Sequence, residues 1–328
     1  MSKYSPSTLR RGMIAALALT CLGSAPMAWA DDYPSKPVRL IVSFPPGSGA
    51  DSTARFYATR LKEITKQTFI VENRPGANSF IAAQAVATAV PDGYTLFFAS
   101  NGPVVVNAVL FKSLPYDPVK DFVAVARTAR ATNLLVVPAA SPYKTLADLV
   151  AAAKKAPKKL NYASGSSSYQ IATEEFAELA GADFNHVPYK GAAPAVQDTI
   201  AGVTDFAITD ITASLALVKG GRLRALAVSS DRRHDALPDV PTVIESGIQG
   251  FEFYNWTGMF APAKTPRAVI DKLSQLVQQI TAERETIAFF SKLGGETFAA
   301  GPEEFGRYQI AQIEQWKRVA QRAGIQPQ

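Results

Sequence analysis

The sequence has very few residues that could hold a metal ion or form a disulfide. Its 328 residues include one cysteine and two histidines, and His186 and His234 have no cysteine companions. Transition-metal centres need several such ligands at short spacing, so we expect no metal and no cofactor. The chain also lacks a phosphate loop ending in Gly-Lys-Ser/Thr, a Gly-x-Ser-x-Gly elbow and a His-Glu-x-x-His motif, which argues against the corresponding nucleotide-binding and hydrolase classes.

Long hydrophobic runs are also lacking, apart from a short one near the start. Residues 1–30 have a basic beginning, an apolar run at 13–22 that is too short to cross a membrane, and the small-x-small sequence Ala-Trp-Ala at 28–30. This pattern predicts a secretory signal peptide, cleavage after Ala30 and a periplasmic protein. Cys21 lies in the removed segment, so the exported protein would have no thiol for a disulfide or a nucleophile.

Charge of one sign is in small excess only. The chain has 34 Lys and Arg against 28 Asp and Glu, and three of its basic residues lie in residues 1–30, so the net charge of +6 falls to 31 minus 28, or about +3, on export. A small basic group at residues 222–233 has no interleaved aromatic residues, so we expect no nucleic-acid partner. The apolar fraction of 47% is typical of a globular protein and excludes a disordered chain.

The exported chain alternates short apolar runs with longer helical patterns, which is typical of parallel α/β units. Strands are predicted at 38–44, 69–72, 94–100, 134–137, 160–164, 186–189, 206–209 and 223–230, with helices at 52–65, 79–88, 145–155, 171–180, 194–201, 212–219, 266–282, 285–293 and 302–323. Three turns rich in Gly, Ser and Pro, at 44–51, 163–170 and 188–194, each lead into a helix. Free amides and the helix dipole favour an anion at such a start, so the three turns predict one convergent anion site.

Nine segments, in order along the chain, resemble the Bug or tripartite tricarboxylate transporter receptor family of periplasmic solute-binding proteins. They are Tyr33–Arg39, Phe44–Asp51, Val71–Ala77, Pro91–Leu96, Tyr116–Phe122, His186–Gly191, Leu223–Val228, Leu237–Thr242 and Ala261–Pro266. The resemblance implies a two-lobe α/β binding protein of type II, with a ligand cleft between the lobes and two crossing hinge strands. It places residues 31–131 and 251–328 in lobe 1 and 132–250 in lobe 2. Polar residues at Ala129–Asn133 and the segment Ile248–Gly250 suggest breaks at these boundaries.

The first turn supplies six candidate ligand-binding residues, which are Phe44, Pro46, Gly47, Ser48, Gly49 and Asp51. For Asp51 we favour a role as the cap of a helix that begins at Ser52 over contact with ligand. For the amides of Gly47 and Ser48 the preference is reversed, because the resembling family holds a ligand carboxylate with this loop.

The second turn supplies Gly165, Ser166, Ser167, Ser168, Tyr169 and Gln170. Gln170 stands where the resembling family commonly has histidine. The serines could instead cap a helix that begins at Ile171, and capping is compatible with binding because spare amides remain. The Tyr169 ring could equally stack on a flat ligand or pack in the protein.

The third turn and two strand ends complete the candidate site, with Tyr189, Gly191, Ala192, Ala193, Ser100 and Asp210. Asp210 corresponds to the position where the family places an acid or amide in the cleft wall, and capping of a helix from Thr212 is an equal alternative. A carboxylate in the wall would repel a third ligand carboxylate. Phe98, Tyr254 and Trp256 are expected in the core.

These observations predict a receptor and not an enzyme. We expect a monomer that captures a small organic carboxylate, a dicarboxylate with terephthalate as one candidate, for the inner-membrane permease subunits of a tripartite tricarboxylate-type transporter. One alternative is a ligand sensor that docks on a membrane kinase or chemoreceptor. Another is a secreted hydrolase that uses a serine of 166–168, although His186, in a strand-like segment, is a poor candidate for its base.

Overall fold

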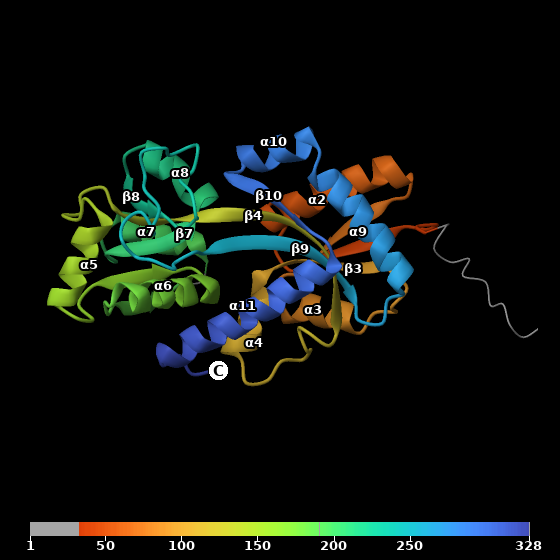
Figure 1. The fold of residues 1–328 in the computed structure, drawn as a ribbon, viewed down its shortest axis with the longest axis horizontal. Coiled ribbons are helices and arrows are strands. Elements are labelled where there is room, and N and C mark those ends of the chain that lie inside the picture. Colours follow the sequence, from red (N-terminus) through yellow and green to blue (C-terminus); the bar gives the residue numbers. More distant parts are fainter. Residues whose placement is uncertain (1–32, 190, 328) are drawn as a thin grey trace, which may run out of the picture.

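The computed structural model describes residues 33–189 and 191–327 (Figure 1). The predicted signal peptide and its cleavage after Ala30 lie outside these residues. Within them the strands are β1 (Val38–Val42), β2 (Phe69–Asn73), β3 (Thr95–Ser100), β4 (Phe122–Pro138), β5 (Asn161–Ser164), β6 (Asn185–Pro188), β7 (Phe206–Asp210), β8 (Leu223–Val228), β9 (Tyr254–Pro262) and β10 (Gly295–Ala300).

Helices alternate with the strands through most of the chain. They are α2 (Gly49–Thr65), α3 (Phe80–Ala87), α4 (Asn107–Leu110), α5 (Leu146–Lys155), α6 (Ser167–Ala180), α7 (Ala192–Ile200), α8 (Ile211–Lys219), α9 (Arg267–Thr281), α10 (Arg284–Lys292) and α11 (Pro302–Arg322), with a 3₁₀ turn at Ala77–Ser79 and a π-helical segment at Gly102–Val106. The α/β class expected from the alternation is confirmed. The predicted strands and helices do not include β9, β10, the first half of β4 or the helical segment from Gly102 to Leu110.

The strands form two parallel groups that share β4. In lobe 1, β1 pairs with β2 and β3 in parallel, and in lobe 2, β5 pairs with β6 and β7 in parallel. The long strand β4 is antiparallel to its neighbours, pairing with β9 as far as Thr132 and with β7 from Asn133 onward. Figure 1 shows β4 and β9 running between the two lobes, so a single strand of 17 residues belongs to both.

The predicted polar break at Ala129–Asn133 is wrong, because these residues lie inside β4. Ala129, Arg130 and Ala131 pair with both β9 and β10, Thr132 pairs with β9, and Asn133 pairs with β7. The Arg130 guanidinium lies 3.9 Å from the centre of the Tyr254 ring and 4.4 Å from that of Phe298. These two cation–π contacts stabilise the charged side chain on the sheet. Polar side chains therefore continue this strand where the sequence pattern suggested an end.

Alternate residues of the lobe 1 strands point into separate cores. Leu40 and Val42 of β1 pack with α2, α9 and α10, whereas Ile41 belongs to the cluster that includes α3 and α11. Figure 1 shows α2, α9 and α10 on one side of this sheet and α3, α4 and α11 on the other. The C-terminal helices thus complete lobe 1. None of the described helices is long and apolar enough to cross a bilayer.

Candidate functional site

The predicted site residues lie at the carboxyl ends of strands in both lobes. Parallel strands end at the same edge of a sheet, which is where α/β folds bind ligands. In lobe 1 these are the ends of β1 and β3, and in lobe 2 the ends of β5, β6 and β7. Ser100 at the end of β3 pairs with Thr257, and two residues earlier on β9 Asn255 bonds to Asp210 at the end of β7. The two edges therefore meet across the start of β9.

In lobe 1 the turn after β1 leads into α2 earlier than the sequence suggested. The helix begins at Gly49, not at Ser52, and its cap is Ser48, whose side chain accepts a hydrogen bond from the Asp51 amide at 3.2 Å. Helix geometry leaves the amides of Gly49 and Ala50 without an intrahelical acceptor. A Cβ added at Gly47 or Gly49 would meet no atom within 4 Å, so this turn faces open space.

Asp51 holds that turn in place through its carboxylate. Its carboxylate accepts hydrogen bonds from the Gly47 amide (2.9 Å), Asn73 Nδ2 (2.8 Å) and Arg55 Nε (3.0 Å), and the residue is only 3% exposed. Burial opposes ionisation, but these donors outweigh it and hold the pKa of Asp51 below its ordinary value. The predicted cap role is corrected, because Asp51 sits at the third position of the helix and braces the turn.

The amides of Gly47 and Ser48, which the sequence analysis preferred as ligand donors, have acceptors within the turn. The Gly47 amide donates to Asp51, and the Ser48 amide donates to the carbonyl of Pro45 at 3.2 Å. The amides left for an anion are those of Gly49 and Ala50. Sequence reasoning found the turn but shifted the donors by two residues, because it placed the helix start too late.

The second turn, in lobe 2, shows the same early helix start. Helix α6 begins at Ser167 instead of Ile171, with Ser166 as its cap residue, so the first amides, of Ser167, Ser168 and Tyr169, have no intrahelical acceptor. The Ser166 side chain makes no capping hydrogen bond. The predicted capping role of the serines is therefore not seen, and three amides and the exposed Ser166 hydroxyl remain for binding.

The third turn packs directly on the second. Helix α7 begins at Ala192 after Gly191, whose φ of +117° favours glycine. A Cβ added at Gly165 would lie 2.6 Å from Ala192 Cα, so only glycine allows the two turns to approach this closely. A Cβ on Gly191 itself would meet no atom within 4 Å. The start of α7, with the amides of Ala192 and Ala193, thus faces open space beside the start of α6.

Asp210 and Tyr169 form a hydrogen-bonded network with two asparagines of the crossing strands. The Tyr169 hydroxyl donates to one oxygen of Asp210. Asn255 Nδ2 lies 2.7 Å from the other oxygen, 2.8 Å from the Tyr169 hydroxyl and 3.0 Å from Asn133 Oδ1, so its two protons are shared among three acceptors. Burial and the neighbouring carboxylate raise the pKa of Tyr169 far above its ordinary value, so the phenol keeps its proton.

The network also describes the surroundings of Tyr169 and Asp210, for each of which the sequence left two roles open. Tyr169 is 5% exposed and packs edge-on to Phe253, so its ring packs in the protein and does not offer a face to a ligand. Asp210 precedes α8 but makes no side-chain capping hydrogen bond. Sequence reasoning missed Asn133 and Asn255. Asparagine is disfavoured in strands, so its presence in β4 and β9 was the signal that could have found them.

Buried polar atoms without a partner mark both strand edges. Among the described residues five buried side chains have an N or O atom with no hydrogen-bond partner, and three of them, Ser43, Asn101 and Thr209, directly adjoin the predicted site residues Phe44, Ser100 and Asp210. Leaving such a group unpaired costs about 1–3 kcal/mol, and each of these three is a sequence neighbour of a predicted site residue.

The remaining predicted residues have protein partners or other surroundings. The Ser100 hydroxyl accepts from the Gly102 amide at 3.3 Å, and the Tyr189 hydroxyl donates to Asp198 of α7 at 2.8 Å. Gln170 lines a cavity of about 190 Å³ between α4, α6 and residues 325–326. Phe44 is half-buried and Pro46 exposed, while Phe98, Tyr254 and Trp256 lie in the core as expected.

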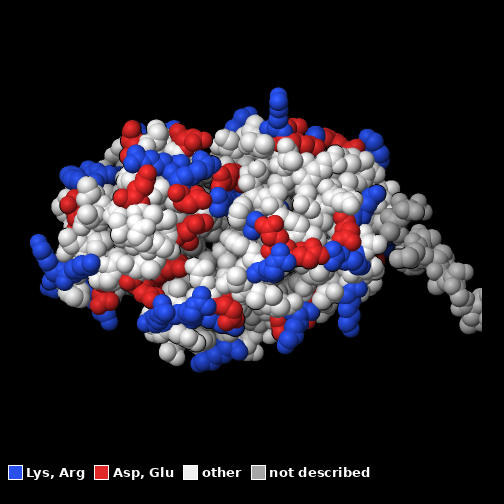
Figure 2. All heavy atoms as spheres, in the orientation of Figure 1, with Lys and Arg blue, Asp and Glu red and all other residues white. Residues whose placement is uncertain are grey.

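The surroundings of His186 give no support to the hydrolase alternative. His186 Nε2 lies 2.6 Å from the hydroxyl of Ser164, a buried residue, and its ring stacks on Tyr162. Burial lowers its pKa. The histidine is therefore committed to Ser164 and not to the serines at 166–168. On the face in Figure 2, basic and acidic side chains are interspersed, without the continuous basic field that nucleic acid requires.

Comparison with known proteins agrees with this geometry. Residues 53–325 match the family described as tripartite tricarboxylate transporter family receptor. A Pseudomonas sp. strain P51 protein encoded in the tcbD–tcbE intergenic region is 35% identical over 314 residues, covering 94% of this chain and 93% of that protein. The protein BugT of Bordetella pertussis is 32% identical over 314 residues, covering 95% and 96%.

Solved structures of periplasmic binding proteins share the fold over nearly the whole described chain. A protein of R. palustris with adipate has a TM-score of 0.81 at 34% identity, covering 90% of this chain and 100% of that one. The periplasmic binding protein BugD has a TM-score of 0.76 at 30% identity, covering 90% and 100%. MatC from Rhodopseudomonas palustris with bound malate has a TM-score of 0.75 at 28% identity, covering 88% and 99%.

Proposed function

Because this chain belongs to the tripartite tricarboxylate transporter receptor family, we propose that it binds a small dicarboxylate between its two lobes and presents it to a membrane transporter of the tripartite tricarboxylate type. The family consists of periplasmic solute receptors, so the protein is a receptor and not an enzyme. No bond of the ligand is made or broken. What the protein supplies is a set of donors that replaces the water around the carboxylates.

The observation that carries this proposal is the presence of unused donors on both lobes. Lobe 1 offers the first amides of α2, and lobe 2 offers those of α6 and α7. Amides at a helix start bind anions. Donors at two separate places favour a ligand with an anionic group at each end, which is the chemistry of a dicarboxylate.

The surroundings of Asp210 and Tyr169 narrow the ligand class. The carboxylate of Asp210 would repel a third ligand carboxylate, which disfavours a tricarboxylate such as citrate. Its oxygens accept from Tyr169 and Asn255, so an ammonium group would have to compete with them. The buried Tyr169 ring removes the argument for an aromatic diacid such as terephthalate. We therefore propose an aliphatic dicarboxylate, and the related structures with adipate and malate support this class.

The location and the division into lobes complete the proposal. We propose that residues 1–30 are a signal peptide cleaved after Ala30, so that the protein acts in the periplasm as a monomer. Mass measurement and light scattering on protein recovered from the periplasm test both points. We also propose that residues 31–131 and 251–328 form lobe 1 and 132–250 form lobe 2. The change of β4 partner between Thr132 and Asn133 supports the first of these boundaries.

The ligand proposal is tested by thermal unfolding against mono-, di- and tricarboxylates, with adipate, malate, citrate and terephthalate in the panel. Saturation at a hundredfold over Kd should stabilise the protein by about 2.7 kcal/mol. We expect this effect with an aliphatic dicarboxylate. If no dicarboxylate raises the unfolding temperature, the proposal is wrong.

A matched pair of variants tests the place of binding. Ala193→Glu puts a tethered carboxylate at the exposed start of α7, where it competes with the ligand but favours the helix dipole. Gln197→Glu adds the same charge at an exposed position further along the helix. We expect Ala193→Glu to weaken binding by at least about tenfold, or 1.4 kcal/mol, without loss of stability. Equal affinities in the two variants would show that α7 does not hold the ligand.

A further inference from the structure

The ribbon formed by β4 and β9 has two faces with different contents. Successive residues of a strand point to opposite faces, and directly paired residues of antiparallel strands share a face. Asn133 and Asn255 therefore point to one face, where they meet Tyr169 and Asp210. Thr132 pairs with Tyr254, and both point to the other face. We call the first the site face and the second the rear face.

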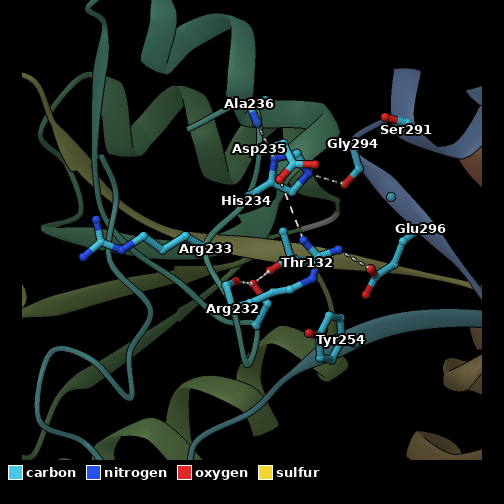
Figure 3. Close-up of a pocket in the computed structure, with 12 residues that line it drawn as sticks. Thr132, Arg232, Arg233, His234, Asp235, Ala236, Tyr254, Ser291, Gly294 and Glu296 are labelled. Atoms are coloured by element: carbon cyan, nitrogen blue, oxygen red, sulfur yellow. Dashed lines mark hydrogen bonds and ion pairs between the residues drawn. The ribbon is translucent and has the colours of Figure 1, made fainter. Parts of the chain in front are cut away.

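The rear face carries a cavity of about 240 Å³ between the two lobes (Figure 3). Thr132 and Tyr254 form its floor, the segment 230–236 that follows β8 forms its lobe 2 wall, and Gly294, Gly295 and Glu296 form its lobe 1 wall. None of the predicted ligand-binding residues lines it. This cavity is therefore separate from the proposed ligand site, with the crossing strands between them.

Several contacts join the lobes around this cavity, among them the hydrogen bond from the Tyr254 hydroxyl to Asp231 at 2.8 Å, and two of them connect the segment 230–236 with the turn before β10 and with β10 itself. Arg232 of lobe 2 and Glu296 of β10 form an ion pair of 2.6 Å, and His234 Nε2 lies 3.1 Å from the carbonyl oxygen of Gly294. Figure 3 shows both contacts bridging the space between the lobes. Glu296 also bonds to Arg130 of β4 at 2.6 Å. We call the contacts of Arg232 and His234 with Glu296 and Gly294 the rear latch.

Polar groups around the cavity form hydrogen bonds with one another, so these groups need no ligand to complete their hydrogen bonding. Thr132 donates to the Ser230 hydroxyl at 2.9 Å, and Ser230 donates to the carbonyl of Arg232 at 2.7 Å. His234 Nδ1 accepts from the amide of Ala236 at 3.1 Å. The function of these groups must therefore be sought in the contact between the lobes.

The rear latch is also connected to the site. Gly294 has a φ of +72°, and a Cβ added there would lie 2.9 Å from Ile211 Cγ2. Ile211 is the first residue of α8 and follows Asp210 directly. The turn that holds one half of the latch thus packs on the residue next to the network in the site.

From this geometry we propose that the rear latch holds the lobes apart and so sets the affinity for ligand. Closure of the lobes around a ligand bends the shared strand β4 toward the site face, and the same rotation separates the groups on the rear face. Contacts on that face are then made when the site is open and are stretched when it closes. Arg232 and Glu296 act as positioning residues, because they change the population of the closed form without touching the ligand.

A charge reversal with a matched control tests this proposal. Arg232→Glu places a carboxylate against Glu296 and should break the latch. Arg233→Glu makes the same charge change one residue later, but Arg233 pairs with Glu245 inside lobe 2 at 2.8 Å. Ligand-free protein is measured by small-angle X-ray scattering, and dicarboxylate affinity by calorimetry. We expect Arg232→Glu to lower the radius of gyration and the apparent Kd, the latter about fivefold, which corresponds to about 1 kcal/mol.

Arg233→Glu should leave both quantities at the wild-type value, which removes the general effect of net charge on an anionic ligand. Arg232→Ala should act in the same direction as Arg232→Glu with a smaller effect, and it serves as the second variant if the reversal fails to fold. The proposal is overturned if Arg232→Glu does not compact the ligand-free protein, if it weakens binding, or if Arg233→Glu behaves identically.

The affinity prediction rests on the proposed function, but the scattering result does not. Failure of wild-type protein to bind any dicarboxylate would therefore reject the ligand and leave the latch to be decided by scattering.

Discussion

The helices α2 and α6 both present unused amides to the proposed site, but each contains a buried carboxylate, and the pKa values of the two carboxylates are shifted in opposite directions. In lobe 1, Asp51 of α2 is buried with three donors, and its pKa is lowered. In lobe 2, Glu175 of α6 is buried with one oxygen unpartnered, and burial raises its pKa to about 7, although the bond from Gln315 opposes this. The Asp51 carboxylate holds the start of α2, whereas the start of α6 is shaped by the close contact between the turn at Gly165 and the turn at Gly191. Charge should therefore control lobe 1 loop geometry, and close packing should control lobe 2.

The largest effect is expected from Gly165→Ala in lobe 2. The added Cβ would lie 2.6 Å from Ala192 Cα, which is backbone and cannot move aside without shifting the start of α7. We expect a loss of stability of about 3 kcal/mol by overpacking, measured by urea unfolding, and loss of detectable ligand binding. Gly49→Ala in α2 is the control, because its Cβ would meet no atom within 4 Å. If both substitutions are tolerated equally, close packing does not shape the lobe 2 turns.

A smaller effect is expected from Asp51→Ala in lobe 1. This change leaves the Gly47 amide, Asn73 and Arg55 without their acceptor, so stability should fall by about 2 kcal/mol and affinity about tenfold. Asp148→Ala is the matched control, since Asp148 caps α5 in a similar way through the amides of Lys144 and Thr145, away from the site. Unfolding and calorimetry should show a stability loss in both variants but weaker binding in Asp51→Ala alone.

The pH dependence of Asp51 has the opposite sign to that of Glu175. A lowered pKa in the folded state gives stability that is present above the ordinary pKa and is lost as pH falls through the folded value. The destabilisation by Asp51→Ala should therefore be constant near neutral pH and shrink only in acid, at pH values below about 4. An effect that changed between pH 6 and 8 would contradict the lowered pKa.

The smallest effect is expected from Glu175→Gln, and only at high pH. Because the folded-state pKa is raised, the contribution of Glu175 is most favourable below its ordinary pKa and is lost as pH rises through about 7. Glutamine keeps the shape and the bond from Gln315 but carries no charge. We expect the variant to be more stable than wild type by about 1–2 kcal/mol at pH 8, with no difference at pH 4. Equal unfolding curves at both pH values would show that Glu175 titrates normally.

The sequence predicted the order of strands, turns and helices around the site better than it predicted which backbone amides lie at the helix starts. Strand, turn and helix were expected at all three turns, and the two-lobe fold is confirmed. The starts of α2, α6 and α7 were placed two to four residues late, because glycine and serine disfavour helix interiors while the first turn tolerates them. Because the start of α2 was placed too late, the sequence analysis chose the amides of Gly47 and Ser48 where the structure leaves those of Gly49 and Ala50 without an acceptor. The spacing Ser48-x-x-Asp51 is the local signal that could have placed the helix start at Gly49 and the Asp51 carboxylate over the turn.

The contacts between lobes were beyond prediction for a different reason. Asn133 and Asn255 are far apart in the chain and meet only because β4 and β9 pair across the lobes. The same holds for Arg232 and Glu296. A one-dimensional pattern shows that a residue is polar but not which distant residue it faces. Prediction therefore succeeded for the order of strand, turn and helix within a unit, but it misplaced the helix starts and failed for the surfaces that join units.

The pairing of β3 with β9 has a consequence for the order in which the chain can fold. The lobe 1 sheet is complete only when β3 pairs with β9, as in the pair Ser100 and Thr257, which are distant in sequence. The lobe 2 strands β5, β6 and β7 lie in one continuous stretch of sequence. Contacts between near residues form faster, because less chain entropy is lost in closing the loop. A chain that emerges from a membrane N-terminus first would thus assemble the second lobe while the first still lacks its central strand. The incomplete first lobe would expose the edge of β3, which makes this interval the one most open to aggregation.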